Sequence, residues 1–316
     1  MTDAGADETR GSPRPLRMLG VTVAWGACFI AIEWGLRDAS VLWFASLRAT
    51  LAGVALLTVA LVQRRSQPRG VGDWMRISVL GLVNVAIAFA AMFAAVIGLS
   101  TGAAAVLANA QPLLILVPAW WLFGERPRRA SVVGMVIGLA GLLVVAVPGG
   151  GGTGAWLSLT AAGAVTAGTL LARSLVTLDV VVVSAWHFLV GGVALAVWAA
   201  AAEGAPDITW TPRFVAVLLF LSLVGTAAAF VVWFEESHRS RLDLLTAWTF
   251  LVPVVGIGLS VVLLDERPSG WALSGLVMVL YALWSSVGRA ALRTPLVVPV
   301  LSSARRAGGA IQHRRR

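Results

Sequence analysis

Three ionisable side chains, Glu33, Arg48 and His187, stand inside long apolar stretches of the sequence. The planar fork of an arginine suits a carboxylate or a phosphate. A carboxylic acid withdrawn from water can hold a proton near neutral pH, and an imidazole titrates there without help. The three residue types therefore favour a site that binds an anion and a proton, with Glu33 as the candidate for proton coupling.

Each of these side chains also has a purely structural alternative. Arg48 could tie down helix-end carbonyls or a loop, and His187 could be a hydrogen-bonded interior histidine. Glu33 could face water or pair with Arg37 or Arg48, because a short turn after the first apolar stretch brings a long arginine within reach. The sequence leaves both interpretations open for all three residues.

Other polar and aromatic side chains in the apolar stretches extend the candidate site. A side-chain amide surrounded by apolar residues has to hydrogen bond within the protein, so we expect at least one of three such amides to line a cavity. Three tryptophans lie deeper than those at the ends of the stretches, and each is either a cavity wall or part of the packed core. The candidate substrate-binding residues are Arg48, His187, Asn84, Asn109, Gln111, Trp25, Trp186 and Trp248.

Two prolines, Pro112 and Pro253, interrupt the apolar stretches. Each leaves a backbone carbonyl without its usual partner in the middle of a helix, which creates a kink. The kink could act as a hinge for gating, and a fixed packing kink is an equally good alternative. Glu125 and Glu266 follow the same two stretches, and we interpret them as structural residues that bond the start of the next helix.

The composition excludes an ordinary soluble domain. Of the 316 residues, 59% are apolar and 12% are charged, and the mean hydropathy is +0.87. A soluble domain is about a quarter charged, and a disordered chain is far less apolar. The single cysteine, Cys28, excludes an intrachain disulfide and a cysteine-based zinc site. No nucleotide-binding or hydrolase motif occurs, so we expect no metal, no cofactor and no enzymatic activity.

Ten apolar segments have the length of a transmembrane helix. About 20 residues at 1.5 Å each are needed to cross the ~30 Å hydrocarbon core of a bilayer. We therefore expect an all-α membrane protein with ten transmembrane helices, between a disordered cytoplasmic tail at 1–17 and a basic cytoplasmic tail at 288–316. The segments are 18–36, 40–62, 74–98, 101–122, 131–147, 155–172, 180–201, 214–234, 244–264 and 271–287.

The basic residues indicate how the chain is oriented in the membrane. All 24 are arginines, and the isoelectric point is near 11.5. With the N-terminus inside, 20 arginines fall on the inner side and three on the outer side, and Arg48 lies within a span. This asymmetry predicts that both termini are cytoplasmic, in the plasma (inner) membrane. The basicity is an orientation signal, so we expect the lipid bilayer and not nucleic acid as a partner.

A weak internal repeat relates two halves of the chain. Pro112 precedes Glu125-Arg126-Pro127 by 13 residues, and Pro253 precedes Glu266-Arg267-Pro268 by the same number. The two patterns lie 141 residues apart. This Pro and Glu-Arg-Pro spacing is hard to obtain by chance in apolar helices, which otherwise match easily.

A second match, between Gly53–Leu56 and Gly192–Leu195 at an offset of 139 residues, pairs Arg48 with His187. We therefore expect five-helix halves at 18–148 and 155–287, joined by a Gly-rich link at 149–154. Because five is odd, the second half enters the membrane upside down. Inverted repeats of this kind are typical of secondary transporters, with the substrate site between the repeats.

A scattered set of residues between 18 and 287 forms a recognisable pattern. Its members are Trp25-Gly26, Arg48, Gln111-Pro112, Gly124-Glu125-Arg126, Gly134, Gly138, Gly141, Pro253 and Asp265-Glu266-Arg267. The pattern resembles the EamA family of the drug/metabolite transporter superfamily. That resemblance implies ten helices in two five-helix repeats, and transport of amino acids, other metabolites or drugs, mostly outward. Glu33 departs from the family pattern, which often has a lysine or a neutral residue near that position.

We therefore expect a secondary transporter that exports a small-molecule substrate by alternating access, driven by a gradient. The substrate would be an amino acid, a similar anionic or zwitterionic metabolite, or a drug, and a homodimer is compatible with this expectation. The alternative is a membrane-embedded enzyme that modifies lipids at Glu235, Glu236 and His238. The charged residues beside that cluster and the internal repeat favour transport.

Overall fold

A computed structural model of the protein describes residues 11–99, 101–126, 129–146, 153–265, 267 and 270–284. Helices make up most of this part of the chain, which contains no strand beyond two isolated β-bridges. The elements of the first half are α2 (Pro15–Gly35), α3 (Val41–Val62), α4 (Val71–Gly81), the π-helix η1 (Leu82–Ile87), α5 (Ala88–Gly98), α6 (Thr101–Ala108), α7 (Gln111–Leu114), α8 (Leu116–Phe123) and α9 (Arg129–Ala146).

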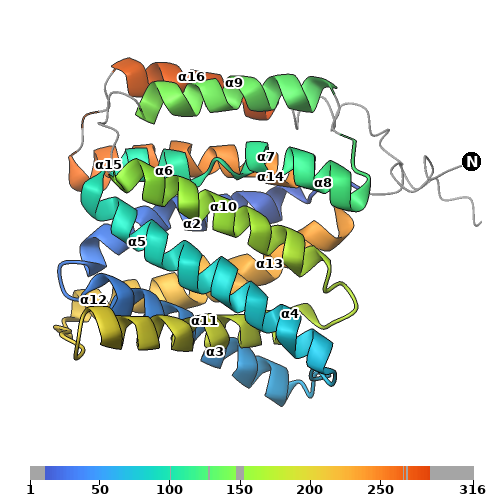
Figure 1. The fold of residues 1–316 in the computed structure, drawn as a ribbon. Coiled ribbons are helices and arrows are strands. Elements are labelled where there is room, and N and C mark those ends of the chain that lie inside the picture. The colour runs from blue at the N-terminus through green and yellow to red at the C-terminus, as the bar shows by residue number, and fades with distance from the viewer. Residues whose placement is uncertain are drawn as a thin grey trace, which may run out of the picture.

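The second half contains two irregular helices, the π-helix η3 and the 3₁₀-helix η4. Its elements are α10 (Thr153–Arg173), α11 (Val180–Ala202), α12 (Pro212–Leu219), η3 (Phe220–Ala228), α13 (Ala229–Arg239), α14 (Leu242–Ala247), η4 (Trp248–Phe250), α15 (Leu251–Leu264) and α16 (Gly270–Leu283). Figure 1 shows the helices running roughly parallel along the length of the molecule.

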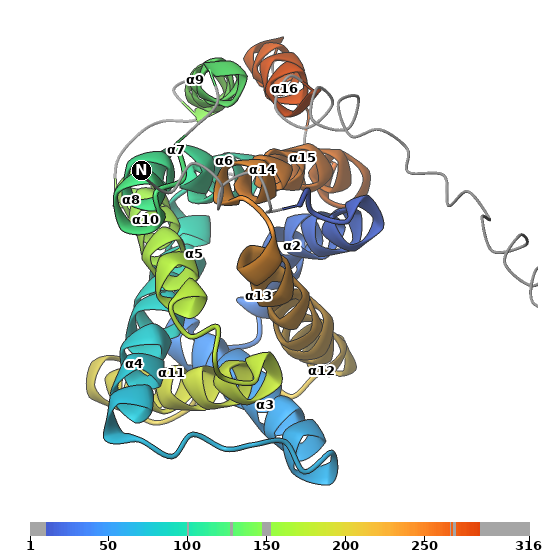
Figure 2. The same ribbon diagram turned by 90° about the vertical axis from the view of Figure 1, so that its right-hand side faces the viewer.

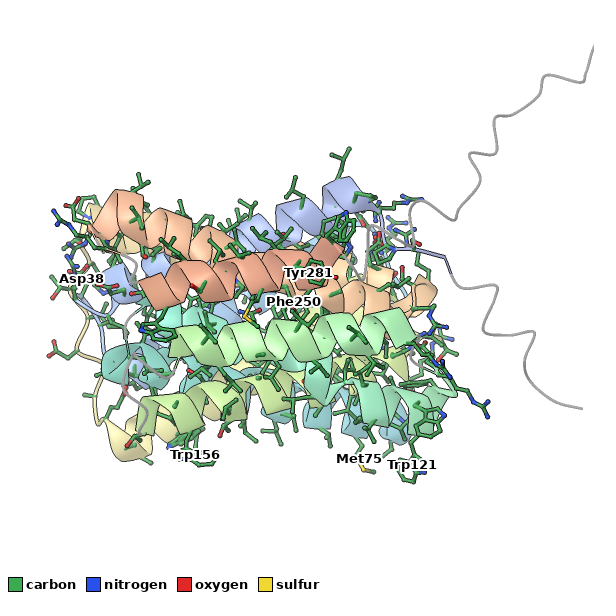
Figure 3. All side chains as sticks on the ribbon, turned by 90° about the horizontal axis from the view of Figure 1, so that it is seen from above. Asp38, Met75, Trp121, Trp156, Phe250 and Tyr281 are labelled. Carbon is green, nitrogen blue, oxygen red and sulfur yellow. The ribbon has the colours of Figure 1, made fainter. Side chains whose placement is uncertain are left out.

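Seven helical stretches of the described chain are long and apolar enough to cross a membrane. Two shorter apolar helices lie at Ser131–Val144 and Leu273–Ala282, and the predicted span 101–122 is divided into α6, α7 and α8. Figure 3 shows oxygen- and nitrogen-bearing side chains gathered at the two ends of the bundle, with carbon covering the length between them. These features confirm an all-α, multi-pass membrane protein, whereas ten spans and an inverted second half stay predictions.

Both prolines that the sequence singled out lie just after a break in a helix. Pro112 has no N–H to bond the carbonyl four residues before it. At the break, the Asn109 backbone N–H donates to the Val106 carbonyl, three residues back, at 3.2 Å. The Asn109 side-chain amide donates to the Ala105 carbonyl at 2.6 Å. In the second half, the 3₁₀ turn Trp248–Phe250 directly precedes the helix that contains Pro253.

The two π-helices occupy matching places in the two halves. Their first residues lie 138 positions apart and their last residues 141, close to the offset of the sequence repeat. Each interrupts a long apolar helix, η1 between α4 and α5, and η3 between α12 and α13. A π-helix leaves some backbone groups open to other partners and is frequent at functional sites.

Helices of the two halves pack on each other in pairs. Contacts join α3 to α11, α5 to α10, α2 to α15, and α9 to α16. Figures 1 and 2 show α9 and α16 side by side, outside the main group of helices. Their contact is close, because a Cβ on Gly141 would lie 2.7 Å from the Gly275 carbonyl oxygen. A Cβ on Gly138 would lie 2.6 Å from the Phe250 ring.

The crossing of α11 with α4 and η1 gives a prediction about stability. A Cβ on Gly191 would lie 2.4 Å from the Val85 Cβ and 2.6 Å from the Gly81 carbonyl oxygen. We expect Gly191→Ala to lower the free energy of unfolding by about 1–3 kcal/mol, the usual cost of overpacking. The measurement is the unfolding midpoint in sodium dodecyl sulfate.

Gly163 in α10 provides the matched control, because an added Cβ there meets no heavy atom within 4 Å. Gly163→Ala should be neutral or gain up to about 1 kcal/mol from helix propensity. Equal midpoints for the two variants would show that α11 is free to shift away from η1, contrary to the prediction.

Candidate functional site

Arg48 is buried where α3 meets η3 and is 2% exposed. Its Nε donates to the Thr226 hydroxyl at 2.7 Å, and its Nη2 donates to the Gly225 carbonyl at 3.4 Å and to the Cys28 sulfur at 3.6 Å. The buried Nη1 has no hydrogen-bond partner. The guanidinium carbon lies 4.6 Å from the Phe89 ring centroid, so the cation rests on an aromatic face.

The π-helix η3 supplies the acceptors around Arg48. The Gly225 carbonyl also accepts the Trp25 indole N–H at 3.2 Å, and the Thr226 hydroxyl donates to the Leu221 carbonyl at 2.7 Å. A Cβ on Gly225 would lie 2.4 Å from the Cys28 sulfur, so only glycine fits there. The arginine is therefore held by α2 of the first half and η3 of the second.

Of the alternatives that the sequence left open for Glu33, the ion pair with Arg37 is present and the one with Arg48 is not. Glu33 pairs with Arg37 at 3.5 Å, one helical turn further along, and accepts a hydrogen bond from the Thr101 hydroxyl. The Glu33 side chain is about a third exposed (32%), whereas Arg48 has no carboxylate partner among the described residues. The i,i+4 spacing lets Arg37 reach Glu33 locally. A role for Glu33 in proton coupling stays a prediction.

Aromatic rings from both halves form one connected cluster beside Arg48. Trp25 lies 5.5 Å from Phe230 and 5.0 Å from Trp233, between ring centroids. Phe188 lies 5.1 Å from Phe230 and 6.3 Å from Phe89. The members of this aromatic cluster are Trp25, Phe89, Phe93, Phe188, Phe230, Trp233 and Phe234.

His187 is fully buried at the edge of the aromatic cluster. Its Nδ1 lies 3.0 Å from the Val183 carbonyl oxygen of its own helix, and its Nε2 has no hydrogen-bond partner. The ring centroid lies 4.0 Å from that of Phe188, 5.6 Å from Phe234 and 6.3 Å from Phe230. Arg48 and His187, which the repeat pairs in sequence, are thus connected through the contact between Phe89 and Phe188.

Gln111 in α7 is connected to the aromatic cluster, and Asn84 in η1 packs against the same helix, α10. The Gln111 amide donates to the Thr169 hydroxyl at 2.8 Å, and that hydroxyl also accepts the Trp233 indole N–H at 3.2 Å. Asn84 packs against α10 at Gly168, where a Cβ would lie 2.2 Å from the Asn84 Oδ1. The Asn84 Nδ2 is buried without a hydrogen-bond partner.

Among the described residues, no hydrogen bond or ring contact joins the side chains of the other three candidates to that of Arg48 or His187. Trp186 hydrogen bonds to Gln67 at 2.9 Å and packs edge-on against Trp74, near the start of α4. Asn109 bonds to its own helix at the break described above. Trp248 forms part of η4, and its buried indole N–H has no partner.

The two carboxylates of the alternative enzyme site contact the N-terminal segment, whereas the His238 Nε2 lies 3.0 Å from the Ala172 carbonyl oxygen in α10. Glu235 pairs with Arg17 at 2.8 Å. The buried Glu236 accepts the Arg14 backbone N–H at 3.2 Å and pairs with Arg239. These carboxylates thus fasten the start of α2. No group of three metal-ligating side chains occurs within the described ranges.

A second set of buried charges crosses between the halves near the start of α14. Glu125 pairs with Arg173 at 2.5 Å and accepts the Leu242 backbone N–H at 2.9 Å. Arg241 pairs with Asp243 at 3.2 Å and donates to the Arg126 carbonyl at 2.8 Å.

Glu125 bonds the start of a helix, as expected of a structural residue, and the helix start that it is seen to bond belongs to α14. Its carboxylate caps α14 of the other half, because the fold brings that helix end to the loop after α8. Its sequence counterpart, Glu266, lies outside the described residues.

Comparison with known proteins agrees with this architecture. A model of the EamA-like transporter family matches twice, at residues 15–147 and 152–287, which confirms two related halves. A chloroplastic WAT1-related protein of Arabidopsis thaliana is 28% identical over 281 residues, covering 82% of this chain and 66% of the relative. A probable amino-acid metabolite efflux pump of Salmonella typhimurium is 27% identical over 282 residues, covering 84% and 92%. A solved crystal structure shares the fold, with a TM-score of 0.71 at 20% identity, covering 88% of this chain and 97% of that chain.

Proposed function

This chain belongs to the EamA-like transporter family, and from that premise we propose that it exports a small zwitterionic or anionic metabolite by alternating access. An amino acid is the leading substrate class, and a drug is the second. The energy comes from an ion gradient or the substrate's own gradient, since the sequence has no nucleotide-binding motif. The membrane is the plasma membrane, with both termini cytoplasmic on the arginine asymmetry.

The observation that carries this proposal is the environment of Arg48. A buried cation is costly unless an anion compensates it, and the hydrogen bonds of this guanidinium all go to neutral groups. A substrate carboxylate would supply the missing charge, and Nη1 is the donor left to receive it.

The aromatic cluster suits the rest of a zwitterionic metabolite. An ammonium group is attracted to the face of a tryptophan or phenylalanine ring. Trp25 shares the Gly225 carbonyl with Arg48 and touches Phe230, so such a face lies directly beside the cation. The name of the Salmonella relative, an amino-acid metabolite efflux pump, supports the same substrate class.

The breaks before Pro112 and Pro253 are the natural places for the halves to bend during alternating access. Each lies where a helix has already lost a regular backbone hydrogen bond. The Glu125–Arg173 pair would then hold one end of the bundle closed in this conformation, because it joins the loop after α8 to α10.

The proposal is tested by a flux screen in proteoliposomes. The purified protein is assayed for uptake and efflux of labelled amino acids, nucleobases and cationic drugs, with and without a pH gradient. We expect flux of at least one amino acid above that of protein-free liposomes. Flux of a drug but of no amino acid would make drugs the substrate class in place of amino acids. No flux of any compound in the panel would contradict transport.

A further inference from the structure

We infer that His187 is the residue at which a proton is exchanged for the substrate, with Nε2 as the atom that takes the proton. The inference rests on the proposed transport function and adds the coupling ion and its binding atom. It assigns coupling to a residue at the contact of the two halves, in place of Glu33.

The hydrogen bond of His187 fixes which nitrogen can act as a base. A backbone carbonyl only accepts hydrogen bonds, so Nδ1, 3.0 Å from the Val183 carbonyl oxygen, carries the proton of the neutral ring. Nε2 then holds a free lone pair, and no donor occupies it. A histidine kept only for packing would normally have both nitrogens satisfied when fully buried. Nε2 is therefore the atom to which a proton would bind.

Glu33 is less suited to this role. Its carboxylate is already neutralised by Arg37 and hydrogen bonded by Thr101, and it is 32% exposed. Both of these contacts lie at the end of α2, and the open Nε2 of His187 has no counterpart there. Among the described residues, no hydrogen bond or ion pair joins Glu33 to Arg48 or to the aromatic cluster.

Among the described residues, no acidic side chain hydrogen bonds to the His187 imidazole. The elements packed near its ring are α3, α4, η1 and α13, with α5 reached through Phe188. None of their ionisable side chains hydrogen bonds to the imidazole. These side chains are Arg48 on α3, Asp73 and Arg76 on α4, and Glu235, Glu236, His238 and Arg239 on α13, whereas η1 and α5 carry none.

The aromatic cluster explains why a proton and a substrate would exclude each other. A protonated His187 and a substrate ammonium group carry the same charge, and both would lie against Phe230. Like charges repel strongly in a site of low dielectric. Binding of the ammonium group therefore displaces the proton from Nε2 to water on one side, and reprotonation from the other side releases the substrate. An inward proton gradient then drives the substrate outward.

The test separates exchange from coupling in proteoliposomes, using a mixture of ¹⁴C-labelled amino acids as the probe. Exchange is measured as counterflow at equal pH, and coupling as accumulation driven by a pH gradient. We expect the wild type to do both and His187→Gln to keep counterflow while its gradient-driven accumulation falls to the leak of empty liposomes. His238→Gln is the matched control, because His238 bonds to the Ala172 carbonyl outside the cluster and should leave both readouts intact.

The outcomes distinguish the two proposals. Absence of counterflow by the wild type contradicts the transport function itself. If His187→Gln keeps both counterflow and gradient-driven accumulation, His187 is not the proton site, while the transport function stands. If Glu33→Gln loses gradient-driven accumulation instead, the proton site is Glu33.

A second measurement covers the case in which His187→Gln is inactive in both assays. The wild type in detergent and weak buffer should release protons when the amino-acid mixture is added, read with a pH-sensitive dye. No release by the wild type overturns the inference, and release by wild type but not by His187→Gln supports it.

Discussion

Replacing Arg48 with methionine is expected to abolish transport while leaving the protein at least as stable as the wild type. The guanidinium is 2% exposed, and its hydrogen bonds go to neutral groups on α2 and η3. A buried charge of this kind costs folding free energy, so an apolar side chain of similar length removes that cost. The same charge is what a substrate carboxylate needs.

Removal of Arg48 also leaves no polar neighbour unsatisfied. Thr226 is an acceptor for Arg48 and keeps its own donation to the Leu221 carbonyl. The Gly225 carbonyl keeps the hydrogen bond from the Trp25 indole. If Arg48 instead tied down the irregular backbone of η3, its loss would lower stability and transport together.

Two measurements on the same preparation decide between these roles. Counterflow of the ¹⁴C-labelled amino-acid mixture reports transport. Unfolding is followed by reaction of a fluorogenic maleimide with Cys28, the single cysteine and a buried one. Arg48→Lys keeps the charge but loses the planar fork, so we expect exchange with an affinity weakened by about 1.5–3 kcal/mol, roughly 10- to 150-fold. A lowered unfolding temperature in Arg48→Met would make Arg48 a structural residue.

Local properties of the sequence predicted the long helices well. The apolar segment at 180–201 is α11 (Val180–Ala202), and that at 40–62 is α3 (Val41–Val62). Hydrophobic length decides these elements, because an apolar helix of about 20 residues satisfies its own backbone in lipid. Proline chemistry likewise pointed to Pro112 and Pro253, although the break falls upstream of each proline, where the missing N–H leaves a carbonyl open.

The sequence could not predict which residues hydrogen bond to the side chains of the candidate site. Thr226 and Gly225 stand out only through contacts with Arg48 across 178 and 177 residues. Their π-helical backbone has no local signature, although its match at the repeat offset in η1 is a usable signal. Thr169 is similar, since its meeting with Gln111 and Trp233 depends on how α7, α10 and α13 pack.

Replacing Glu125 with glutamine is expected to cost about 3–5 kcal/mol in the free energy of unfolding, the usual loss when one partner of a buried ion pair is removed. The Glu125 and Arg173 side chains are 3% and 4% exposed. The variant leaves Arg173 without this carboxylate and weakens the cap on α14, which the ionised group provides through the Leu242 N–H. The measurement is the unfolding midpoint in sodium dodecyl sulfate.

The control for Glu125→Gln is the same substitution in an exposed ion pair. Glu235 pairs with Arg17 at 2.8 Å, with side chains 43% and 39% exposed. Solvent screens such a pair, so Glu235→Gln should cost only about 0–1 kcal/mol. If the two variants lost similar amounts of free energy of unfolding, the buried Glu125–Arg173 pair would contribute no more to stability than the exposed pair.

The double variant Glu125→Gln/Arg173→Gln isolates the pair from its surroundings. The double variant removes both charges together, so it should be more stable than the sum of the single losses predicts, by about 0.5–3 kcal/mol. Recovery stays incomplete, because Arg173 also donates to the Ser240 carbonyl and Glu125 also caps α14. Strictly additive losses would show that the two residues act separately and that the ion pair does not hold the loop after α8 to α10.

The same double variant should also raise the leak of proteoliposomes to the amino-acid mixture if this pair closes one end of the bundle.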